Sequence, residues 1–467
     1  MTTPPAGPTD ALRPAPHRAT PADAGPERRG GAHAPRAPHA TGWWLHATVT
    51  GLIALVWLVV GPSEGPFQNH VAELVGVESV WLLGSSVLVL TRAPRLERSF
   101  GGVAGALRWH RLAGLAGVAL ALLHPLLLVA DPTVPATAEG SVLADLLVPL
   151  TLVAVVLAGW ALMTPTSRVA AWRGPVGWLA RRSYDRWRAV HGLLAVFLVV
   201  AMAHGAVDGT SLPDRPVLLA LYAGVCAAGL WALAERMVVA RLGLREVAGT
   251  VTAVERFGTR TVVLTVVPDR PVRHAAGQFL ELGTPSSGER PHPFSITSAP
   301  GTPAVELAVR TAGAGTTRLV ERVAVGERVR LGTPRGDLGS GATTTREVWL
   351  AGGIGVAPFV SCIRARRQTG SVGRVDLVWA ARGFDDEPFV DELAAEAGRS
   401  GWLVLHLHDT RRSTLSAADV VAAGGGAIDA MSVVACGPPG MVTRLGDDLA
   451  SAGLPRGRWR TEAFSYR

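Results

Sequence analysis

Six apolar runs, each about as long as a membrane-spanning helix, constrain this chain more than any other feature of its sequence. The runs lie at about residues 43–60, 70–90, 111–130, 142–163, 189–207 and 217–234. A helix needs ~20 mainly apolar residues to cross a hydrocarbon core of ~30 Å. The sequence therefore predicts a bundle of six transmembrane helices over residues 41–240.

Arginine is distributed unevenly over the loops that join these runs. It gathers before the first run, after the second and after the fourth, whereas the three intervening loops carry a single arginine. Because cytoplasmic loops are rich in basic residues, we expect both termini in the cytoplasm and the bundle in the plasma membrane. Residues 1–40 show no apolar periodicity and no signal-peptide core, so a disordered cytoplasmic tail is expected there. The net charge of +8 does not indicate nucleic acid, since the arginines flank apolar segments.

The residue pattern of the sequence changes twice after the last apolar run. Short β-branched runs separated by Gly and Pro occupy residues 245–343 and predict an antiparallel β-barrel. Residues 344–467 hold a buried strand, a glycine turn and a helix, followed by strands at α/β spacing. The predicted fold is a membrane α-helical bundle, then this barrel, then an α/β nucleotide-binding domain. Three cysteines exclude a disulfide framework and a four-thiolate metal centre.

Two of the apolar runs each carry a pair of histidines. His110 and His124 are fourteen residues apart in the third run, and His191 and His204 are thirteen apart in the fifth. Both runs cross the membrane in the same direction, so His110 shares a depth with His191, and His124 with His204. The two levels are separated by about 20 Å, which suits two stacked haems, each between two imidazoles. The alternative is that these residues make hydrogen bonds between helices.

The helical geometry fits one of these spacings better than the other. At about 100° per residue, fourteen positions return a side chain to within ~40° of its starting face, but thirteen leave it ~140° away. Met202 lies nearer to the face of His191, and thioethers can bind haem iron. Met202 would, however, put the two ligands of a haem at different depths. We therefore expect His204 to be the ligand, with a helix irregularity or a lateral offset of the haem.

Three stretches of the second half have side chains suited to a flavin or a dinucleotide. In "RPHPFSITSAP", residues 290–300, an aromatic residue followed by a hydroxyl can stack on a flavin ring and hydrogen-bond its edge. In "RTAGAGTTRL", Arg310, Gly313 and Thr316 offer a cation, an open backbone amide and a hydroxyl to a pyrophosphate, unless the stretch is a plain turn. "AGGIGVAP" is a glycine turn between a strand and a helix, which indicates either a dinucleotide site or close packing.

A fourth stretch, "ACGPPGM", ends a later strand beside a tight turn. Its Cys436 is either part of a site or a buried structural cysteine.

Together these features resemble the NADPH oxidase and ferric reductase superfamily, in which a ferric-reductase-like transmembrane domain is fused to a ferredoxin–NADP reductase-like module. The resemblance covers about residues 43–467. It rests on the histidine spacings, "HPFSITSAP", the Arg-x-x-Gly-x-x-Thr-x-x-Leu pattern at 310–319, "GGIGVAPF", "CGP" and the terminal "EAFSYR". The absence of lysine and the many Ala, Gly, Pro and Arg residues indicate a bacterial member. The thirteen-residue histidine spacing is the family's own, which favours His204.

The resemblance implies a role for individual residues of this chain. FAD would contact His292, Pro293, Phe294 and Ser295, its diphosphate Arg310, Gly313 and Thr316, and the nicotinamide dinucleotide Gly353, Gly355, Pro358, Cys436 and Pro438. Phe464 would cover the flavin, with Tyr466 as the alternative, and Phe464 and Cys436 would be the catalytic pair. His110, His124, His191 and His204 would bind the iron of two b-type haems. No EF-hand pattern supports regulation by calcium.

The expected function is a transmembrane electron conduit from cytoplasmic NADPH or NADH through FAD and two haems. The acceptor is a small molecule outside, either oxygen, which gives superoxide, or a ferric complex, and no obligatory protein partner is expected. Arg382 is placed to contact the adenosine end of the donor, with help from Arg411 and Arg412. A guanidinium favours the 2′-phosphate of NADPH, but Asp385 or Asp386 can instead pair with Arg382 or favour NADH.

Two other functional classes fit parts of the pattern. One is a membrane-anchored flavin reductase whose bundle serves a quinone or a protein partner, with structural histidines. The other is a cation-handling membrane protein regulated by a flavin module, which would need acidic residues within the spans. Glu73, Glu78 and Asp145 are the acidic residues nearest to the spans, and we assign them to span boundaries.

Overall fold

The computed structural model describes most of the chain between residues 41 and 461. The described residues are 41–60, 67–91, 93–129, 153, 191–208, 212, 214–239, 242–336, 338–339, 346–369 and 373–461. Apart from residue 153, the predicted span at 142–163 lies outside them. Phe464 and Tyr466 also lie outside them, so the predicted flavin cover is not part of the structure described below.

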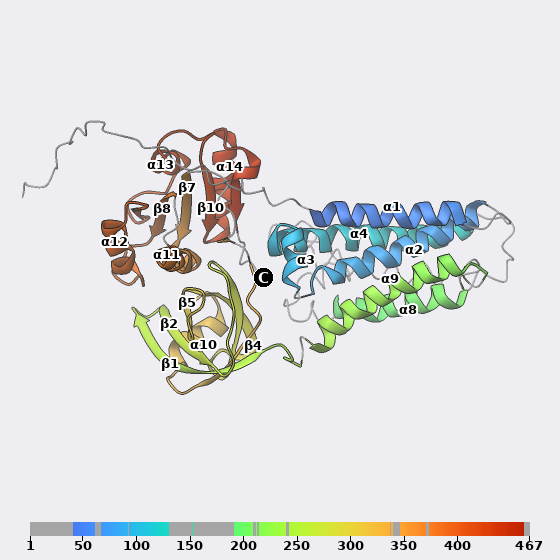
Figure 1. The fold of residues 1–467 in the computed structure, drawn as a ribbon, viewed down its shortest axis with the longest axis horizontal. Helices are drawn as coiled ribbons and strands as arrows, with labels where there is room; N and C mark the ends of the chain where they lie inside the picture. The colour runs from blue at the N-terminus through green and yellow to red at the C-terminus, as the bar shows by residue number, and fades with distance from the viewer. Residues whose placement is uncertain are drawn as a thin grey trace, which may run out of the picture. The chain divides into compact units, whose positions relative to one another are not determined.

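The first part of the fold is helical. Its helices are α1 (Thr41–Val60), α2 (Phe67–Leu88), the short α3 (Pro94–Ser99), α4 (Gly102–Val129), α8 (Leu194–Asp208) and α9 (Pro216–Ala234), which continues into a π-helical turn (Glu235–Val239). Helix α2 packs against α1, α4, α8 and α9, and these helices run side by side (Figure 1). Pro216 opens α9 at a position where the missing N–H costs nothing, since the first amides of a helix have no partner within it.

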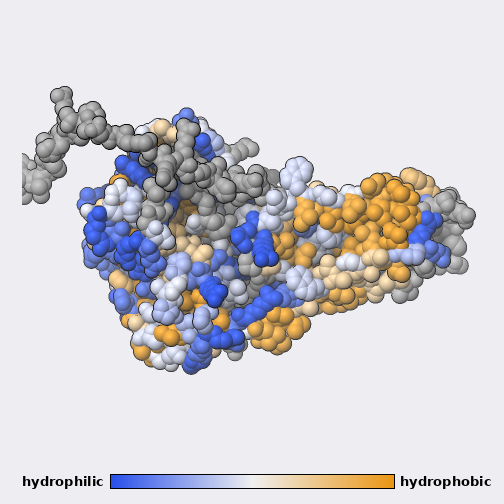
Figure 2. All heavy atoms as spheres, viewed as in Figure 1, coloured by the Kyte–Doolittle hydropathy of each residue, from blue (hydrophilic) through white to orange (hydrophobic). Residues whose placement is uncertain are grey.

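Four described segments are long and apolar enough to cross a membrane: Thr41–Val60, Phe67–Leu88, Gly105–Leu128 and Pro216–Val239. A shorter apolar helix covers Leu194–Ala206. Apolar side chains gather on the surface over these helices, whereas polar side chains predominate over the sheet-containing part (Figure 2). Exposed apolar residues such as Leu58, Leu115 and Val200 are expected where lipid surrounds the helices. Membrane helices are therefore confirmed, and the number six stays a prediction.

The second part is an antiparallel sheet that curls into a barrel. Its strands are β1 (Val247–Phe257), β2 (Thr261–Pro268), β3 (Phe279–Thr284), β4 (Gly288–Ser295), β5 (Val305–Arg310) and β6 (Arg328–Leu331). They are ordered β4-β3-β6-β1-β2-β5, and an isolated bridge between Ile296 and Leu307 joins the two edges. Helix α10 (Ala314–Arg322) turns Leu319 and Val320 into the barrel core. The predicted antiparallel barrel is confirmed.

The third part is a parallel sheet with helices. Its strands are β7 (Arg346–Gly352), β8 (Arg374–Ala381), β9 (Leu403–Asp409), β10 (Ser432–Cys436) and β11 (Trp459–Thr461), and its helices are α11 (Ala357–Thr369), α12 (Val390–Arg399), α13 (Ala417–Ala423) and α14 (Pro439–Ser451). All neighbouring strands pair in parallel, in the order β11-β10-β7-β8-β9. Two separate apolar clusters pack on the sheet, as expected when strands such as β7 are buried on both faces. The predicted α/β domain is confirmed.

Candidate functional site

The structure brings the predicted histidine pairs together. The ring centroids of His110 and His191 are 5.9 Å apart, and those of His124 and His204 are 6.2 Å apart. The two rings of each pair are nearly perpendicular, at 84° and 76°. The pairing that the helix directions predict is therefore present, whereas binding of a metal by these rings stays a prediction.

Helix α2 orients the two histidines of α4. His110 Nδ1 donates to the backbone oxygen of Ser86 at 2.9 Å, and His124 Nδ1 donates to that of Ala72 at 2.8 Å. A carbonyl oxygen only accepts, so in each ring Nδ1 carries the hydrogen, and Nε2 of the neutral imidazole keeps its lone pair. Such an outer hydrogen bond is what usually fixes the ring of a metal-binding histidine.

The thirteen-residue spacing in the fifth span is accommodated by a break in the helix. His191 and Gly192 are followed by a turn at Leu193, and the regular helix α8 begins only at Leu194. The oxygen of Leu193 accepts from the amide of Val196 at 3.0 Å, a tighter bond than that of an α-helix, and also from the amide of Phe197 at 3.2 Å, the ordinary α-helical bond. His191 lies beside His110 and His204 lies beside His124, both on α4, so the two histidines face the same helix.

Met202 does not take the place of His204. A Cβ added to Gly229 would lie 2.4 Å from Met202 Cε, so the thioether packs against α9. The hydroxyl of Tyr222, also on α9, donates to the backbone oxygen of Met202 at 2.8 Å. Met202 therefore holds α8 to α9.

The donor set fits one metal ion between the rings of each pair. An imidazole nitrogen lies about 2 Å from a metal such as zinc, so two imidazoles on opposite sides of one ion have nitrogen atoms about 4 Å apart and ring centres farther apart still. The measured centroid separations agree with this. In the part of the chain that the structure describes, no three or more His, Cys, Asp or Glu side chains gather to hold an ion. Among these residues each pair therefore offers two imidazoles, and binding of haem by them stays a prediction.

The predicted flavin residues lie on β4 and at the start of α10. The side chain of His292 lies against the first turn of α10, because a Cβ added to Gly315 would be 2.4 Å from His292 Nε2. The N-terminal amides of a helix attract anions, so phosphate binding by His292 and this helix start stays a prediction. Phe294 is only 8% exposed and packs in the barrel core, while Ser295 is half-buried. Pro293 pairs with Glu281 of β3 in the register of the sheet.

Thr316 caps the helix to which it belongs. Its hydroxyl accepts from the backbone amides of Ala312 at 2.8 Å and Gly313 at 3.0 Å, and donates to the oxygen of Gly313. One donor and two acceptor positions are all that a hydroxyl has. In this structure Thr316 thus shapes the predicted diphosphate loop, and its direct contact with phosphate stays a prediction.

Arg310 joins the barrel to the α/β domain. Its Nε donates to the Thr261 hydroxyl at 3.0 Å, and its Nη2 lies 2.5 Å from a carboxylate oxygen of Glu387, which is largely buried. A Cβ added to Gly353 would lie 2.8 Å from Arg310 Nη1. The predicted diphosphate contact of Arg310 is not tested, but the side chain lies where the two predicted nucleotide sites meet.

The glycine turn and the cysteine loop lie against each other at the carboxyl end of the parallel sheet. A Cβ added to Gly355 would be 2.3 Å from the backbone oxygen of Cys436, and one added to Gly437 would be 2.9 Å from the Cα of Gly352. The chain therefore approaches itself, backbone against backbone, between β7 and β10. Cys436 is 1% exposed.

This place is the topological switch point of the sheet. From β7 the chain proceeds to β8 and β9 on one side, and then returns to β10 and β11 on the other. Ligands of open α/β sheets bind at the carboxyl ends of the strands, where the order reverses. Gly353 has φ +51°, and its oxygen accepts from the indole of Trp379 at 2.9 Å, which fixes the turn. Pro358, one residue into α11, is buried, and Pro438 immediately precedes α14.

The predicted adenosine contacts lie at the ends of β8 and β9. Arg411 is held by Asp409, with its Nη2 2.7 Å from the carboxylate, and its donated hydrogen bonds lower the pKa of Asp409 to about 2. Arg382 is exposed and, among the described residues, makes no ion pair within 4 Å. The alternative in which Arg382 pairs with Asp385 or Asp386 is therefore absent from this structure.

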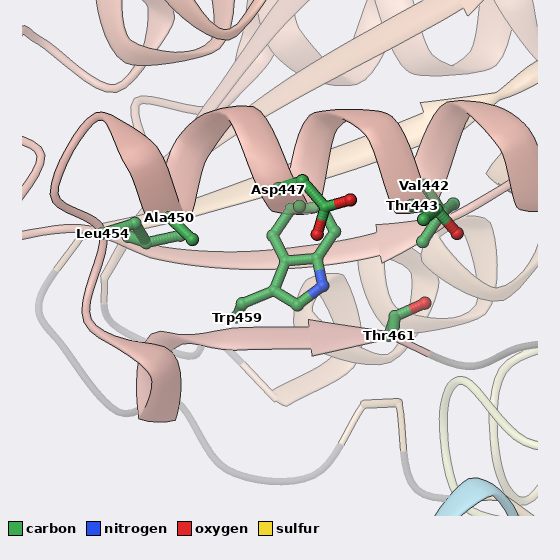
Figure 3. Close-up of a pocket in the computed structure, with 8 residues that line it drawn as sticks. Val442, Thr443, Asp447, Ala450, Leu454, Trp459 and Thr461 are labelled. Carbon is green, nitrogen blue, oxygen red and sulfur yellow. The ribbon is translucent and has the colours of Figure 1, made fainter.

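Two pockets that include residues of the α/β domain lie away from the predicted site. One of ≈ 250 Å³ lies between α14 and β11, where Trp459 packs beside Asp447 (Figure 3). Another, of ≈ 310 Å³, is lined by Cys362, Arg366 and Arg460 among others. None of the predicted site residues lines either of these two pockets.

Two residues that support the site were not recognised from the sequence, and a third residue was misassigned. Glu387, which holds Arg310, has no sequence motif around it. Trp379 lies in the strand next to the glycine turn, and an indole in a buried strand is a signal, because its N–H needs a partner. Glu78, assigned to a span boundary, lies in the middle of α2, and its position within the apolar run was a signal that we misread.

Two known protein families match separate parts of the chain. Residues 75–202 match the family described as the ferric reductase like transmembrane component, and residues 349–446 match the oxidoreductase NAD-binding domain.

Individual relatives match about half of the chain. Ferredoxin–NADP reductase B of Sorangium cellulosum (strain So ce56) is 30% identical over 218 residues, which cover 40% of this chain and 84% of that protein. The ferredoxin reductase component of 3-ketosteroid-9-alpha-monooxygenase from Rhodococcus rhodochrous is 29% identical over 235 residues, 48% of this chain and 66% of that protein. Among solved structures, phthalate dioxygenase reductase is 19% identical with a TM-score of 0.41, over 46% of this chain and 67% of that one.

Proposed function

Because the chain belongs to the ferredoxin–NADP reductase family and carries a ferric-reductase-like transmembrane domain, we propose that this membrane oxidoreductase passes electrons from NAD(P)H through FAD and two b-type haems across the membrane. The proposal rests on one observation: the bundle holds two pairs of facing histidines, and each pair lies at its own level. A reductase that serves a soluble partner has no need of two histidine pairs inside the membrane.

When bound, FAD supplies the conversion of a hydride into single electrons, and haem supplies single-electron carriers. The protein supplies the residues that hold and orient these cofactors. His110 with His191 and His124 with His204 would hold the two haems, and the carbonyls of Ser86 and Ala72 keep Nε2 of the α4 histidines available. Held by two imidazoles each, the haems would supply electron transfer rather than direct binding of a substrate.

The reductase residues would bind and orient the donor and the flavin. The first turn of α10 with His292 would receive the FAD diphosphate, and Ser295 would lie near the flavin edge. Gly353 and Gly355 let a dinucleotide approach the backbone at the switch point, beside Cys436 and Pro438. Arg382, with Arg411 beside it, would contact the adenosine end and favour NADPH.

The remaining parts of the proposal concern topology and the acceptor. The bundle would have six spans in the plasma membrane, with both termini and the reductase module in the cytoplasm. The electrons would leave from the level of His124 and His204 to a small molecule outside, oxygen or a ferric complex. No nucleic acid and no obligatory protein partner would take part.

One observation favours a second candidate. A similar relative is a ferredoxin reductase component of a monooxygenase, so a membrane-anchored flavin reductase that serves a quinone or a protein partner without two haems is the alternative.

Reduced-minus-oxidised absorption spectra of the purified full chain separate the two candidates. The proposal expects a b-type signal from two haems, and the loss of one haem with retention of FAD in His110→Ala and in His191→Ala, since flavin and haem use separate residues. Met202→Leu, next to the pair but packed on α9, is the matched control and should keep both haems. Absence of a haem signal in the wild type, or full haem content in both alanine variants, would overturn the proposal.

A further inference from the structure

A carboxyl group lies in the middle of the bundle, between the two histidine levels. Glu78 belongs to α2, whose carbonyls at Ala72 and Ser86 accept from the histidines of the two levels. At 1.5 Å per residue, Glu78 lies about 9 Å along the helix axis from Ala72 and about 12 Å from Ser86. The assignment of Glu78 to a span boundary is therefore wrong.

Glu78 is buried without a hydrogen-bond partner. Its side chain is 7% exposed, and within the described residues neither carboxylate oxygen has a hydrogen-bond partner. The polar groups near it on α2 are used elsewhere: Ser79 donates to the oxygen of Gly117 at 2.8 Å, and Ser85 to that of Leu82 at 3.0 Å. Its own helix therefore offers no partner.

The helices packed against α2 do not neutralise the carboxyl group either. Their described titratable groups are His46 on α1, Arg108, His110, Arg111 and His124 on α4, His204 on α8, and Tyr222 and Cys226 on α9. His46 and Tyr222 hydrogen-bond to backbone oxygens. Among the residues that the structure describes, none of these groups forms an ion pair with Glu78.

An isolated carboxylate in a low-dielectric interior is costly, so it must either bind a proton or lie near a positive charge. A ferric haem carries one more positive charge than a ferrous haem. Two such groups above and below Glu78 would stabilise its ionised form when oxidised, and much less when reduced. Ionisable residues at this depth are functional candidates by default.

We propose that Glu78 is a redox-linked protonation site, which binds a proton when an electron enters the bundle and releases it when the electron leaves. The inference rests on the proposed function, because it requires the haems. The electron comes from NAD(P)H, one ferric iron becomes ferrous, and one proton from water adds to a carboxylate oxygen of Glu78. When the iron is oxidised by the acceptor, the proton returns to water.

The test is a potentiometric titration of both haems in the purified full chain at several pH values. In the wild type, a coupled proton makes reduction of at least one haem up to tenfold more favourable per unit fall in pH, which is about 59 mV for a one-electron couple. Glu78→Gln should flatten this dependence, and Glu78→Asp should keep it. Glu73→Gln, the same change on the same helix at a less buried position, is the control and should behave as the wild type.

Further outcomes separate this inference from the proposed function. A wild type without haems overturns the proposed function. Haems with the same pH dependence in the wild type and in Glu78→Gln overturn the inference alone. If Glu78→Gln does not assemble, reduced-minus-oxidised infrared spectra of the wild type decide: a protonated-carboxyl band that appears on reduction and shifts in heavy water is expected, and its absence refutes the inference.

Discussion

Replacing Gly355 by alanine should disturb the nicotinamide site without affecting flavin binding. The added Cβ would lie 2.3 Å from the backbone oxygen of Cys436 and 2.8 Å from the Cα of Gly437. Ordinary contacts begin near 3.4 Å, so the glycine turn and the cysteine loop must move apart by about 1 Å in a close-packed interior. Both obstacles are backbone atoms, which no change of rotamer can remove.

Overpacking of this kind typically costs about 1–3 kcal/mol. If the whole cost falls on the bound state of the dinucleotide, its dissociation constant rises about 5- to 150-fold. If the cost lowers the free energy of unfolding instead, the melting temperature of the α/β domain decreases. The predicted FAD residues on β4 and α10 take no part in this contact, so FAD content should stay at the wild-type level.

The assay is titration of NADPH into the flavin-loaded full chain, with thermal melting in parallel. Gly398→Ala is the matched control, because Gly398 lies in α12 and an added Cβ meets nothing within 4 Å. That variant should bind NADPH as the wild type does and melt no lower, since alanine is the better helix former. An unchanged dissociation constant together with an unchanged melting temperature in Gly355→Ala would refute the reasoning from backbone contact.

Two further predictions concern the ends of β8 and β9. Arg382→Ala should reduce the preference for NADPH over NADH, because loss of one charged contact costs roughly 1.5–3 kcal/mol; steady-state kinetics with both donors measure this, with the exposed Arg270→Ala on the barrel as the control, and an unchanged preference would contradict the assignment. The pKa of Asp409 lies at about 2 because Arg411 donates to its carboxylate, so this ion pair stabilises the fold above the ordinary carboxyl pKa of about 3.9 and ceases to do so as the pH falls toward 2. Asp409→Asn should therefore lower the melting temperature at neutral pH and not at pH near 2, and an equal difference at both would speak against the ion pair.

The histidine pairs show what the sequence could predict and what it could not. The depth of each histidine follows from the direction of its span and the rise per residue, and the structure pairs His110 with His191 and His124 with His204 accordingly. The carbonyls of α2 that orient two of these rings could not be predicted, since every residue has a carbonyl and only packing selects one. The helix irregularity was expected, but its place at Leu193 was not.

In the reductase part, too, local elements could be predicted from the sequence, but contacts between distant residues could not. Strand spacing predicted the α/β domain and the glycine turn at its first strand, but not that Cys436, about eighty residues later, would touch that turn. That contact depends on the order of strands, which the chain sets only when β10 returns beside β7. The ion pair of Arg310 with Glu387 joins residues seventy-seven positions apart, and no local pattern announces it.

Vectorial electron transfer tests the central claim most directly. The purified full chain would be reconstituted into sealed vesicles, with NADPH added on the side of the reductase module and a membrane-impermeant ferric complex or cytochrome enclosed on the other side. The account predicts that the enclosed acceptor is reduced by the wild type, and that reduction stops in His110→Ala and His124→Ala although both still oxidise NADPH with a soluble acceptor. Reduction only on the side of NADPH in the wild type, or undiminished transfer in both variants, would contradict it.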